Sequence, residues 1–223
     1  MKGEREKLAV DYSVYLVTDR RLANGRPTRA IVEAAIRGGV SCVQLREKDC
    51  STREFVDEAR GLHPLLKQHR VPLIINDRLD IAMAIGAEGI HLGQEDMHIL
   101  DARRLVGDTM IIGISAENLG DAIEAERQGA DYIGISPVFS TPTKTDTAPP
   151  LGLAGIQRIR EAVSIPLVGI GGINHHNARD IISAGADGVA VVSAIVSAGC
   201  PETAAAALRD LVRKQTTHIL RNT

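Results

Sequence analysis

The sequence predicts an α/β protein built as a single (β/α)8 TIM barrel, and three observations support this prediction. Short apolar segments alternate with longer helical patterns along most of the 223-residue chain. Eight such pairs can be counted, and eight βα units close a barrel at this chain length. A weak repeat of two units is also visible at every second strand, in the segments GGVSCVQL, GAEGIHLG, GADYIGIS and GADGVAVV. An open, doubly wound sheet is the alternative.

The expected strands are short and mostly apolar, as in parallel sheets that are covered on both faces. They occupy residues 14–18, 42–46, 72–76, 89–92, 110–115, 132–136, 166–169 and 188–192. The helical patterns that follow them occupy residues 28–38, 51–68, 79–85, 99–106, 118–128, 154–162, 177–183 and 201–215. No linker interrupts this alternation, so we expect one domain over residues 1–223, with an N-terminal extension at 1–12 and the barrel at 13–215.

The helix boundaries carry recognisable signals. Thr28 can cap the first helix, and Ser51 can cap the second with Glu54 at the spacing of a capping box. Glycines follow several of the helical patterns and can adopt the left-handed conformation that ends a helix, at Gly39, Gly86, Gly129 and Gly185. These signals agree with the periodicity of the apolar residues.

Composition excludes several classes of protein. The hydrophobic fraction is 44%, which is typical of folded globular chains, and the net charge is −2, which favours neither nucleic acid nor an anionic membrane as partner. The three cysteines (Cys42, Cys50 and Cys200) lack metal-ligand spacing, so we expect free thiols, with Cys42 buried. The N-terminus lacks the apolar core of a secretory signal, and no apolar run could span a bilayer. We therefore expect a cytoplasmic enzyme.

The active site of such a barrel lies at the carboxyl ends of its strands. At the end of the second expected strand, Gln44, Arg46 and Lys48 alternate and therefore share one face. One interpretation is a clamp for a phosphate or diphosphate. The other is a solvated strand end in which the cations pair with Glu47 or Asp49. These residues alone leave both open.

Two carboxylates follow the third and fourth expected strands. Asp77 and Asp96 would lie at one rim, where paired carboxylates can hold Mg2+ together with water and phosphate oxygens. Alternatively, Asp77 pairs with Arg78 or caps a helix, and Asp96 caps the helix that follows it. The basic residues nearby favour the metal site.

Two further segments indicate phosphate chemistry. Residues 169–172 read Gly-Ile-Gly-Gly and Val192-Ser193 ends the eighth strand, which is where many barrels bind a phosphate. The loop at 139–150, FSTPTKTDTAPP, contains hydroxyls and Lys144 that could close over an anionic substrate, although prolines can also simply stiffen a surface loop.

Taken together in their order along the chain, these motifs resemble one family. YLVTD, VQLREK, IINDR, GIHLGQED, IIGISA, STPTKTDT, VGIGGI and VAVVSAI are similar to the pattern of the thiamine-phosphate synthase family, from about Tyr15 to Ala198. Ser136 and Glu117 depart from that pattern, at positions where the family commonly has Gly and His.

The resemblance implies two substrates and a metal. The residues implied for a pyrimidine diphosphate are Gln44, Leu45, Arg46, Glu47, Lys48, Asn76, Ser115 and Lys144, with Tyr15 and His91 lining the pyrimidine pocket. Those implied for a thiazole phosphate are Thr141, Pro142, Thr143, Gly172, Val192 and Ser193. Asp77 and Asp96 would bind Mg2+, and catalytic roles would fall to Arg46, Lys48, Lys144 and Ser115.

The implied reaction is a dissociative alkyl transfer that releases pyrophosphate, with phosphorylated small molecules as partners and a homodimer as a possible assembly. A sister barrel that aromatises the thiazole would not need the diphosphate residues, all of which are present here. A phosphosugar isomerase or aldolase barrel would need a catalytic Lys or Glu within a strand. A phosphate-binding barrel without catalysis is the non-enzymatic alternative.

Overall fold

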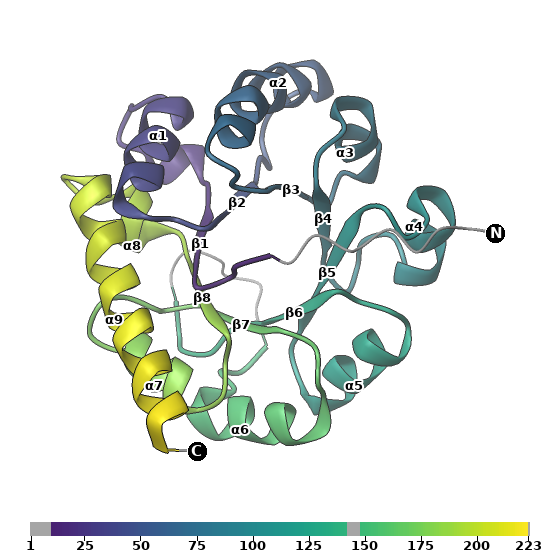
Figure 1. Ribbon diagram of the computed structural model, residues 1–223. Helices are drawn as coiled ribbons and strands as arrows, with labels where there is room; N and C mark the ends of the chain where they lie inside the picture. Colours follow the sequence, from purple (N-terminus) through teal and green to yellow (C-terminus); the bar gives the residue numbers. More distant parts are fainter. Residues whose placement is uncertain (1–9, 142–147, 223) are drawn as a thin grey trace.

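The computed structural model describes residues 10–141 and 148–222. Eight parallel strands form a closed barrel in which each strand pairs with the next and β8 pairs with β1, and helices surround the strands as an outer ring (Figure 1). The predicted (β/α)8 barrel is confirmed, and the open-sheet alternative is wrong. Because all strands are parallel, their carboxyl ends lie at one edge of the sheet, and closure arranges these ends in a ring around one rim.

The strands are short, and each lies within one residue or so of its expected position. They are β1 (Val14–Val17), β2 (Cys42–Leu45), β3 (Leu73–Asn76), β4 (Gly89–Leu92), β5 (Ile111–Ala116), β6 (Tyr132–Ile135), β7 (Leu167–Ile170) and β8 (Gly188–Val191). The longer helices are α1 (Thr28–Gly38), α2 (Thr52–Gln68), α3 (Leu79–Ile85), α4 (Ile99–Val106), α5 (Leu119–Arg127), α6 (Gly152–Ala162), α7 (Ala178–Ser183) and α9 (Pro201–Asn222). Two short elements were not expected, the 3-10 helix η1 (Arg20–Leu22) and α8 (Ser193–Val196).

The helix caps agree with the sequence at most positions. The capping box of Ser51 and Glu54 is present at the start of α2, and the four expected glycines have φ values between 66° and 107°. The expected cap at Thr28 is wrong, because Pro27 is the N-cap residue of α1 and Thr28 is already helical. The fixed φ of proline suits this position, but its ring cannot accept a capping hydrogen bond.

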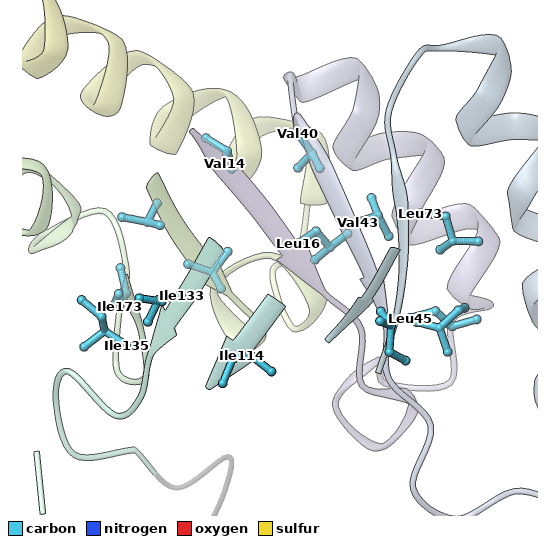
Figure 2. Packing of buried hydrophobic residues seen from close by; sticks show 14 of the residues in the cluster. Val14, Leu16, Val40, Val43, Leu45, Leu73, Ile114, Ile133, Ile135 and Ile173 are labelled. Carbon is cyan, nitrogen blue, oxygen red and sulfur yellow. The ribbon is translucent and has the colours of Figure 1, made fainter. Parts of the chain in front are cut away.

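Alternation along each strand divides the buried side chains into two groups. The larger group lies between the sheet and the helices and includes Leu16, Val43, Leu45 and Ile133 (Figure 2). The smaller group fills the barrel interior and consists of Tyr12, Tyr15, Val17, Cys42, Ile74, Tyr132, Val168 and Ala190. The barrel is therefore a packed core, as expected of this fold.

The end of the expected N-terminal extension is part of this interior. Tyr12 is 6% exposed and its ring centroid lies 4.6 Å from that of Tyr132. Gly188 lets the backbone of Tyr12 approach β8, because an added Cβ would lie 1.8 Å from the Tyr12 carbonyl oxygen. Residues 10–12 thus belong structurally to the barrel, and α9 continues beyond the expected limit at residue 215.

Free thiols are confirmed for all three cysteines, and Cys42 is fully buried. Within the described ranges, each helix is too short or too polar to cross a membrane.

Candidate active site

The candidate site residues come from the carboxyl ends of several neighbouring strands. The inner wall carries Gln44 on β2, Asn76 on β3, His91 on β4 and Ser115 on β5. Gln44, Asn76 and His91 are each no more than 9% exposed. Buried polar groups need hydrogen-bond partners, so their neighbours decide what this wall can do.

A chain of side-chain hydrogen bonds crosses the interior just below the rim. Gln44 Nε2 lies 3.0 Å from the Tyr15 hydroxyl, which lies 2.9 Å from the Tyr132 hydroxyl. The Tyr132 hydroxyl lies 2.8 Å from His91 Nδ1, and His91 Nε2 lies 2.9 Å from Ser115 Oγ. We call these five residues the interior chain. It joins strands β2, β1, β6, β4 and β5 across the barrel.

The basic residues after β2 each have an acidic neighbour from another loop. Arg46 Nη1 lies 3.3 Å from Asp19 Oδ2, and Lys48 Nζ is paired with Asp77 Oδ2. The alternative pairing with Glu47 or Asp49 is not observed, because those carboxylates pair with Arg20 and Arg21. A hollow at this point of the rim is lined by charged residues: Asp19, Arg20, Arg21, Arg46, Glu47, Lys48 and Asp49. Four cations and three carboxylates line it, and this small excess of positive charge suits an anionic group.

Asp77 and Asp96 lie next to each other at the rim. Burial raises the pKa of Asp96 and the adjacent Asp77 carboxylate raises it further, while the backbone N–H of Gly93, 2.7 Å from Asp96 Oδ2, opposes the rise. The alternative roles are wrong. Arg78 pairs with Asp80, and His98, not Asp96, caps α4.

This carboxylate pair fits the needs of Mg2+. Both side chains offer hard oxygen donors, and a cation would relieve the repulsion between them. Among the residues that the structure describes, no cluster of three or more His, Cys, Asp or Glu side chains is arranged around a metal position. Mg2+ commonly binds through one or two carboxylates and takes its further ligands from water and substrate oxygens.

Two residues of the basic stretch point away from the barrel interior. Leu45 is fully buried in the outer core, so its side chain cannot reach a ligand at the rim (Figure 2). The Glu47 side chain is 4% exposed, pairs with Arg20 at 3.3 Å, and has a buried Oε1 without a hydrogen-bond partner among the described residues. Burial raises the pKa of Glu47. The Leu45 side chain is thus kept from the rim by the outer core, and the Glu47 side chain is held by Arg20.

The expected phosphate site lies where β7 and β8 end side by side. Gly171 and Gly172 have φ values of 100° and 65°, and an added Cβ at Gly172 would lie 2.8 Å from the Ser140 carbonyl oxygen. Val192 is the N-cap residue of the short helix α8, which begins at Ser193. Glycines with positive φ beside a short extra helix are how many barrels of this fold bind phosphate.

Part of the implied set lies outside the described residues. Pro142, Thr143 and Lys144 fall in that segment, whereas Thr141, just before it, is described and partly buried. The loop between β6 and α6 is held against the loop after β7 by the hydrogen bond from Phe139 N to Gly171 O at 3.1 Å.

Sequence reasoning missed several residues of the site. Thr18 Oγ1 accepts a hydrogen bond from Arg46 N at 3.0 Å, and Asp19 holds the Arg46 guanidinium. Gln94 donates to the Ser115 carbonyl oxygen, and Tyr132 joins the interior chain. The polar residues that end the first strand, Thr18 and Asp19, were a usable signal. Nothing in the sequence distinguished Tyr132 from an ordinary core residue.

The fold and this rim define a class: an enzyme-type (β/α)8 barrel whose charged C-terminal face is suited to phosphorylated ligands. Residues 14–195 match the model of the family described as thiamine monophosphate synthase. The thiamine-phosphate synthase of Chloroflexus aurantiacus is 53% identical over 203 residues, which cover 91% of this chain and 94% of that protein. The corresponding protein of Albidiferax ferrireducens is 52% identical, with 89% and 91% covered.

A solved structure agrees. Thiamine phosphate pyrophosphorylase from Pyrococcus furiosus superposes with a TM-score of 0.85 at 39% identity, over 92% of this chain and 97% of that one. A 3-hexulose-6-phosphate synthase from Salmonella typhimurium has a TM-score of 0.71 at 15% identity, which shows only a shared fold. The chain belongs to the thiamine monophosphate synthase family. This membership confirms the expected family and enzyme class, a transferase of thiamine biosynthesis.

Proposed function

We propose that this chain joins a pyrimidine carrying a diphosphomethyl group to a thiazole phosphate, forming thiamine phosphate and pyrophosphate with the help of Mg2+. One observation carries the metal-dependent part: Asp77 contacts both Lys48 and Asp96, so a cation and two carboxylates from three different loops meet at one point of the rim. A diphosphate with Mg2+ presents the matching arrangement of charges.

The bond changes are simple to balance. The C–O bond between the pyrimidine methylene carbon and the diphosphate breaks, and both electrons leave with pyrophosphate. The electron-rich pyrimidine bears the positive charge at the methylene carbon, and the lone pair of the thiazole nitrogen then forms the new C–N bond. No side chain has to act as nucleophile, so binding and orientation of two substrates supply much of the rate.

The residues of the rim would stabilise the charge that develops on the leaving group. Arg46, Lys48 and Lys144 would neutralise the diphosphate oxygens, and Asn76 and Ser115 would donate hydrogen bonds to the same substrate. Held by Asp77 and Asp96, Mg2+ would supply further neutralisation of the departing pyrophosphate. The present ion pairs of Arg46 and Lys48, with Asp19 and Asp77, keep these cations in place until an anion binds.

The thiazole phosphate would bind at the other side of the rim. Backbone N–H groups at Gly172, Val192 and Ser193 would receive its phosphate, and the family resemblance adds Thr141, Pro142 and Thr143 to the residues that hold it. The positive φ of Gly172 and the start of α8 at Ser193 support this assignment. The two phosphorylated substrates would then be held at different strand ends of the same rim, with the reacting atoms between them.

The direct test is to incubate the purified protein with both substrates, with Mg2+ and then with EDTA, and to measure thiamine phosphate and pyrophosphate. Equal, Mg2+-dependent release of both products is expected. Binding of thiazole phosphate without any product would contradict the proposal and favour the sister barrel or a binding protein. A homodimer, the absence of nucleic-acid and membrane partners, and a cytoplasmic location stay predictions.

A further inference from the structure

The interior chain begins at an amide and ends at the Ser115 hydroxyl, and its chemistry gives it a direction. The amide nitrogen of Gln44 can only donate, so the Tyr15 oxygen accepts at 3.0 Å. The hydrogen of Tyr15 is then available for the Tyr132 oxygen at 2.9 Å. The thiol of Cys42 also lies beside Tyr15, but sulfur is a weaker acceptor than a phenol oxygen.

Both phenols remain protonated and able to donate. Each is essentially inaccessible to solvent, and burial raises the pKa of Tyr15 and of Tyr132 well above the ordinary value. Since the Tyr132 oxygen accepts from Tyr15, its own hydrogen points to His91 Nδ1, 2.8 Å away. His91 then carries its proton on Nε2 and donates it to Ser115 Oγ at 2.9 Å.

We propose that Tyr132 is a positioning residue for the reaction: by donating to His91 Nδ1 it fixes the Nε2–H tautomer of His91, which makes Ser115 a hydrogen-bond donor toward the substrate. In the opposite tautomer, His91 Nε2 would accept the Ser115 hydrogen, and Ser115 could offer a ligand only lone pairs. The substrate assigned to this position is rich in acceptors, namely diphosphate oxygens and pyrimidine ring nitrogens. The inference rests on the proposed function for the identity of that substrate.

Two glycines of neighbouring strands leave room for the rings of Tyr132 and His91. A Cβ added at Gly113 would lie 2.1 Å from Tyr132 Cζ, and one added at Gly134 would lie 3.0 Å from His91 Cε1. Each glycine therefore accommodates one ring of the interior chain. Tyr12 also packs against Tyr132, with 4.6 Å between ring centroids. The ring of Tyr132 is thus held by its contacts with Gly113 and Tyr12, and its hydroxyl has a defined direction.

The test uses Tyr132→Phe, which keeps the ring and removes the hydroxyl. Tyr12→Phe is the matched control, because it removes a hydroxyl from the same aromatic cluster and leaves the interior chain intact. The first readout is 15N NMR of histidine-labelled protein, with the His91 signals assigned by comparison with His91→Asn. Wild type and Tyr12→Phe should show His91 as the Nε2–H tautomer, and Tyr132→Phe should show a mixture or the Nδ1–H form.

The second readout is turnover in a double-mutant cycle with Ser115→Ala. Loss of one hydrogen bond changes an equilibrium or a rate by roughly 3- to 10-fold, so Tyr132→Phe should lower kcat/KM for the pyrimidine diphosphate by about that factor. Tyr12→Phe should stay within about 2-fold of wild type, because the Tyr12 hydroxyl is not part of the interior chain and the ring that packs on Tyr132 is kept. In the Ser115→Ala background, Tyr132→Phe should have little further effect, because its role passes through Ser115.

The outcomes separate the two proposals. If wild type makes no thiamine phosphate, the proposed function fails, and the His91 tautomer still tests the hydrogen-bond direction. An Nδ1–H tautomer in wild type overturns the inference even if Tyr132→Phe does not fold. Additive losses for Tyr132→Phe and Ser115→Ala in an active enzyme would assign Tyr132 a purely structural role and also overturn it.

Discussion

Asp77 is the residue on which the charges of the rim converge. Its φ of 62° is in the left-handed region, which Asp tolerates better than most residues but which still costs free energy. Its backbone N–H donates to the His91 carbonyl oxygen at 2.9 Å, so the strained turn is fixed to β4. This geometry aims the carboxylate at Lys48 and Asp96 rather than at the helix that follows.

Replacing Asp77 with Asn keeps the shape of the side chain and removes its charge. Under the proposed function, we expect Mg2+-dependent turnover to fall on the order of 100-fold or more, because losing a few kcal/mol of charge stabilisation costs tenfold for about every 1.4 kcal/mol. Asp80→Asn is the control: the Asp80 side chain is 62% exposed and forms an ion pair with the neighbouring Arg78, away from Lys48 and Asp96. Steady-state rates across a Mg2+ titration provide the measurement, and unchanged rates in Asp77→Asn would remove this residue from the metal site.

Glu47 gives a prediction about pH. Its pKa is raised by burial above the ordinary value of 4.5, so between that value and the folded-state pKa the folded chain binds more protons than the unfolded chain. Stability must fall as pH rises through this window. Relative to Glu47→Gln, which cannot titrate, wild type should lose stability from about pH 4.5 upward until Glu47 is fully ionised.

Urea unfolding of both proteins at several pH values between 4 and 7 measures this difference. If the stability of wild type relative to Glu47→Gln rose with pH, the ion pair with Arg20 would outweigh the effect of burial on the pKa of Glu47. A difference in stability that stayed constant with pH would show that the pKa of Glu47 is the same in the folded and unfolded chains. Either result would contradict the prediction.

At the scale of elements, α2 is a helix whose start can be predicted from its capping residues. Ser51 Oγ accepts from Glu54 N at 3.3 Å, and Glu54 Oε2 accepts from Ser51 N at 2.8 Å. Ser51→Ala should lower the free energy of unfolding by about 1 kcal/mol, the usual cost of losing such a cap. The Ser183 hydroxyl donates to the carbonyl oxygen of Arg179 within α7, so Ser183→Ala should change the free energy of unfolding by less than about 0.5 kcal/mol.

Chemical denaturation with guanidinium compares the two variants, and turnover should stay near the wild-type value in both. Equal stability of the two would mean that Glu54 alone satisfies the start of α2. A large loss for Ser183→Ala would mean that the hydroxyl has a role beyond its own helix.

Helices and strands with a clear pattern of apolar residues could be predicted from the sequence, and elements too short to show such a pattern could not. The strands were predictable because each is a short apolar run between a helix-ending glycine or loop and a polar rim segment. The short helices η1 and α8 were not, because three or four residues carry no measurable period. His98 as the cap of α4 and Pro27 as the cap of α1 were missed because neither is a preferred capping residue.

The same contrast applies to the candidate site. Topology places every strand end at one rim, so the polar residues there could be picked out from sequence order alone. Their partners could not: Arg46 pairs with Asp19 across 27 residues, and Tyr15 meets Tyr132 across 117. Such pairs depend on which side chains of different strands face each other, and only the closed barrel determines that.

At the scale of the whole molecule, the ring of helices is completed where the first helix meets the last. α9 packs against α1, α7 and α8, and Figure 1 shows it running beside them at the seam where β8 pairs with β1. Ala205, Leu208 and Val212 are buried on the inner face of α9. Gly38, the last residue of α1, makes close approach possible: an added Cβ would lie 2.3 Å from the Glu202 carbonyl oxygen and 2.7 Å from Ala205 Cβ.

A helical glycine normally weakens its helix, so Gly38→Ala should stabilise the protein if only local propensity counts. Gly61, within α2, is the matched control, because nothing lies within 4 Å of a Cβ added there. Gly61→Ala should raise the free energy of unfolding by about 0.5–1 kcal/mol. Gly38→Ala should lower it by about 1–2 kcal/mol, since overpacking against backbone atoms outweighs the gain in propensity. Thermal and denaturant unfolding measure both variants. If close packing at this seam depends on Gly38, the changes in the free energy of unfolding will have opposite signs. Stabilisation by both would show that α9 can shift away from α1 without loss, and that the seam is not a fixed part of the barrel.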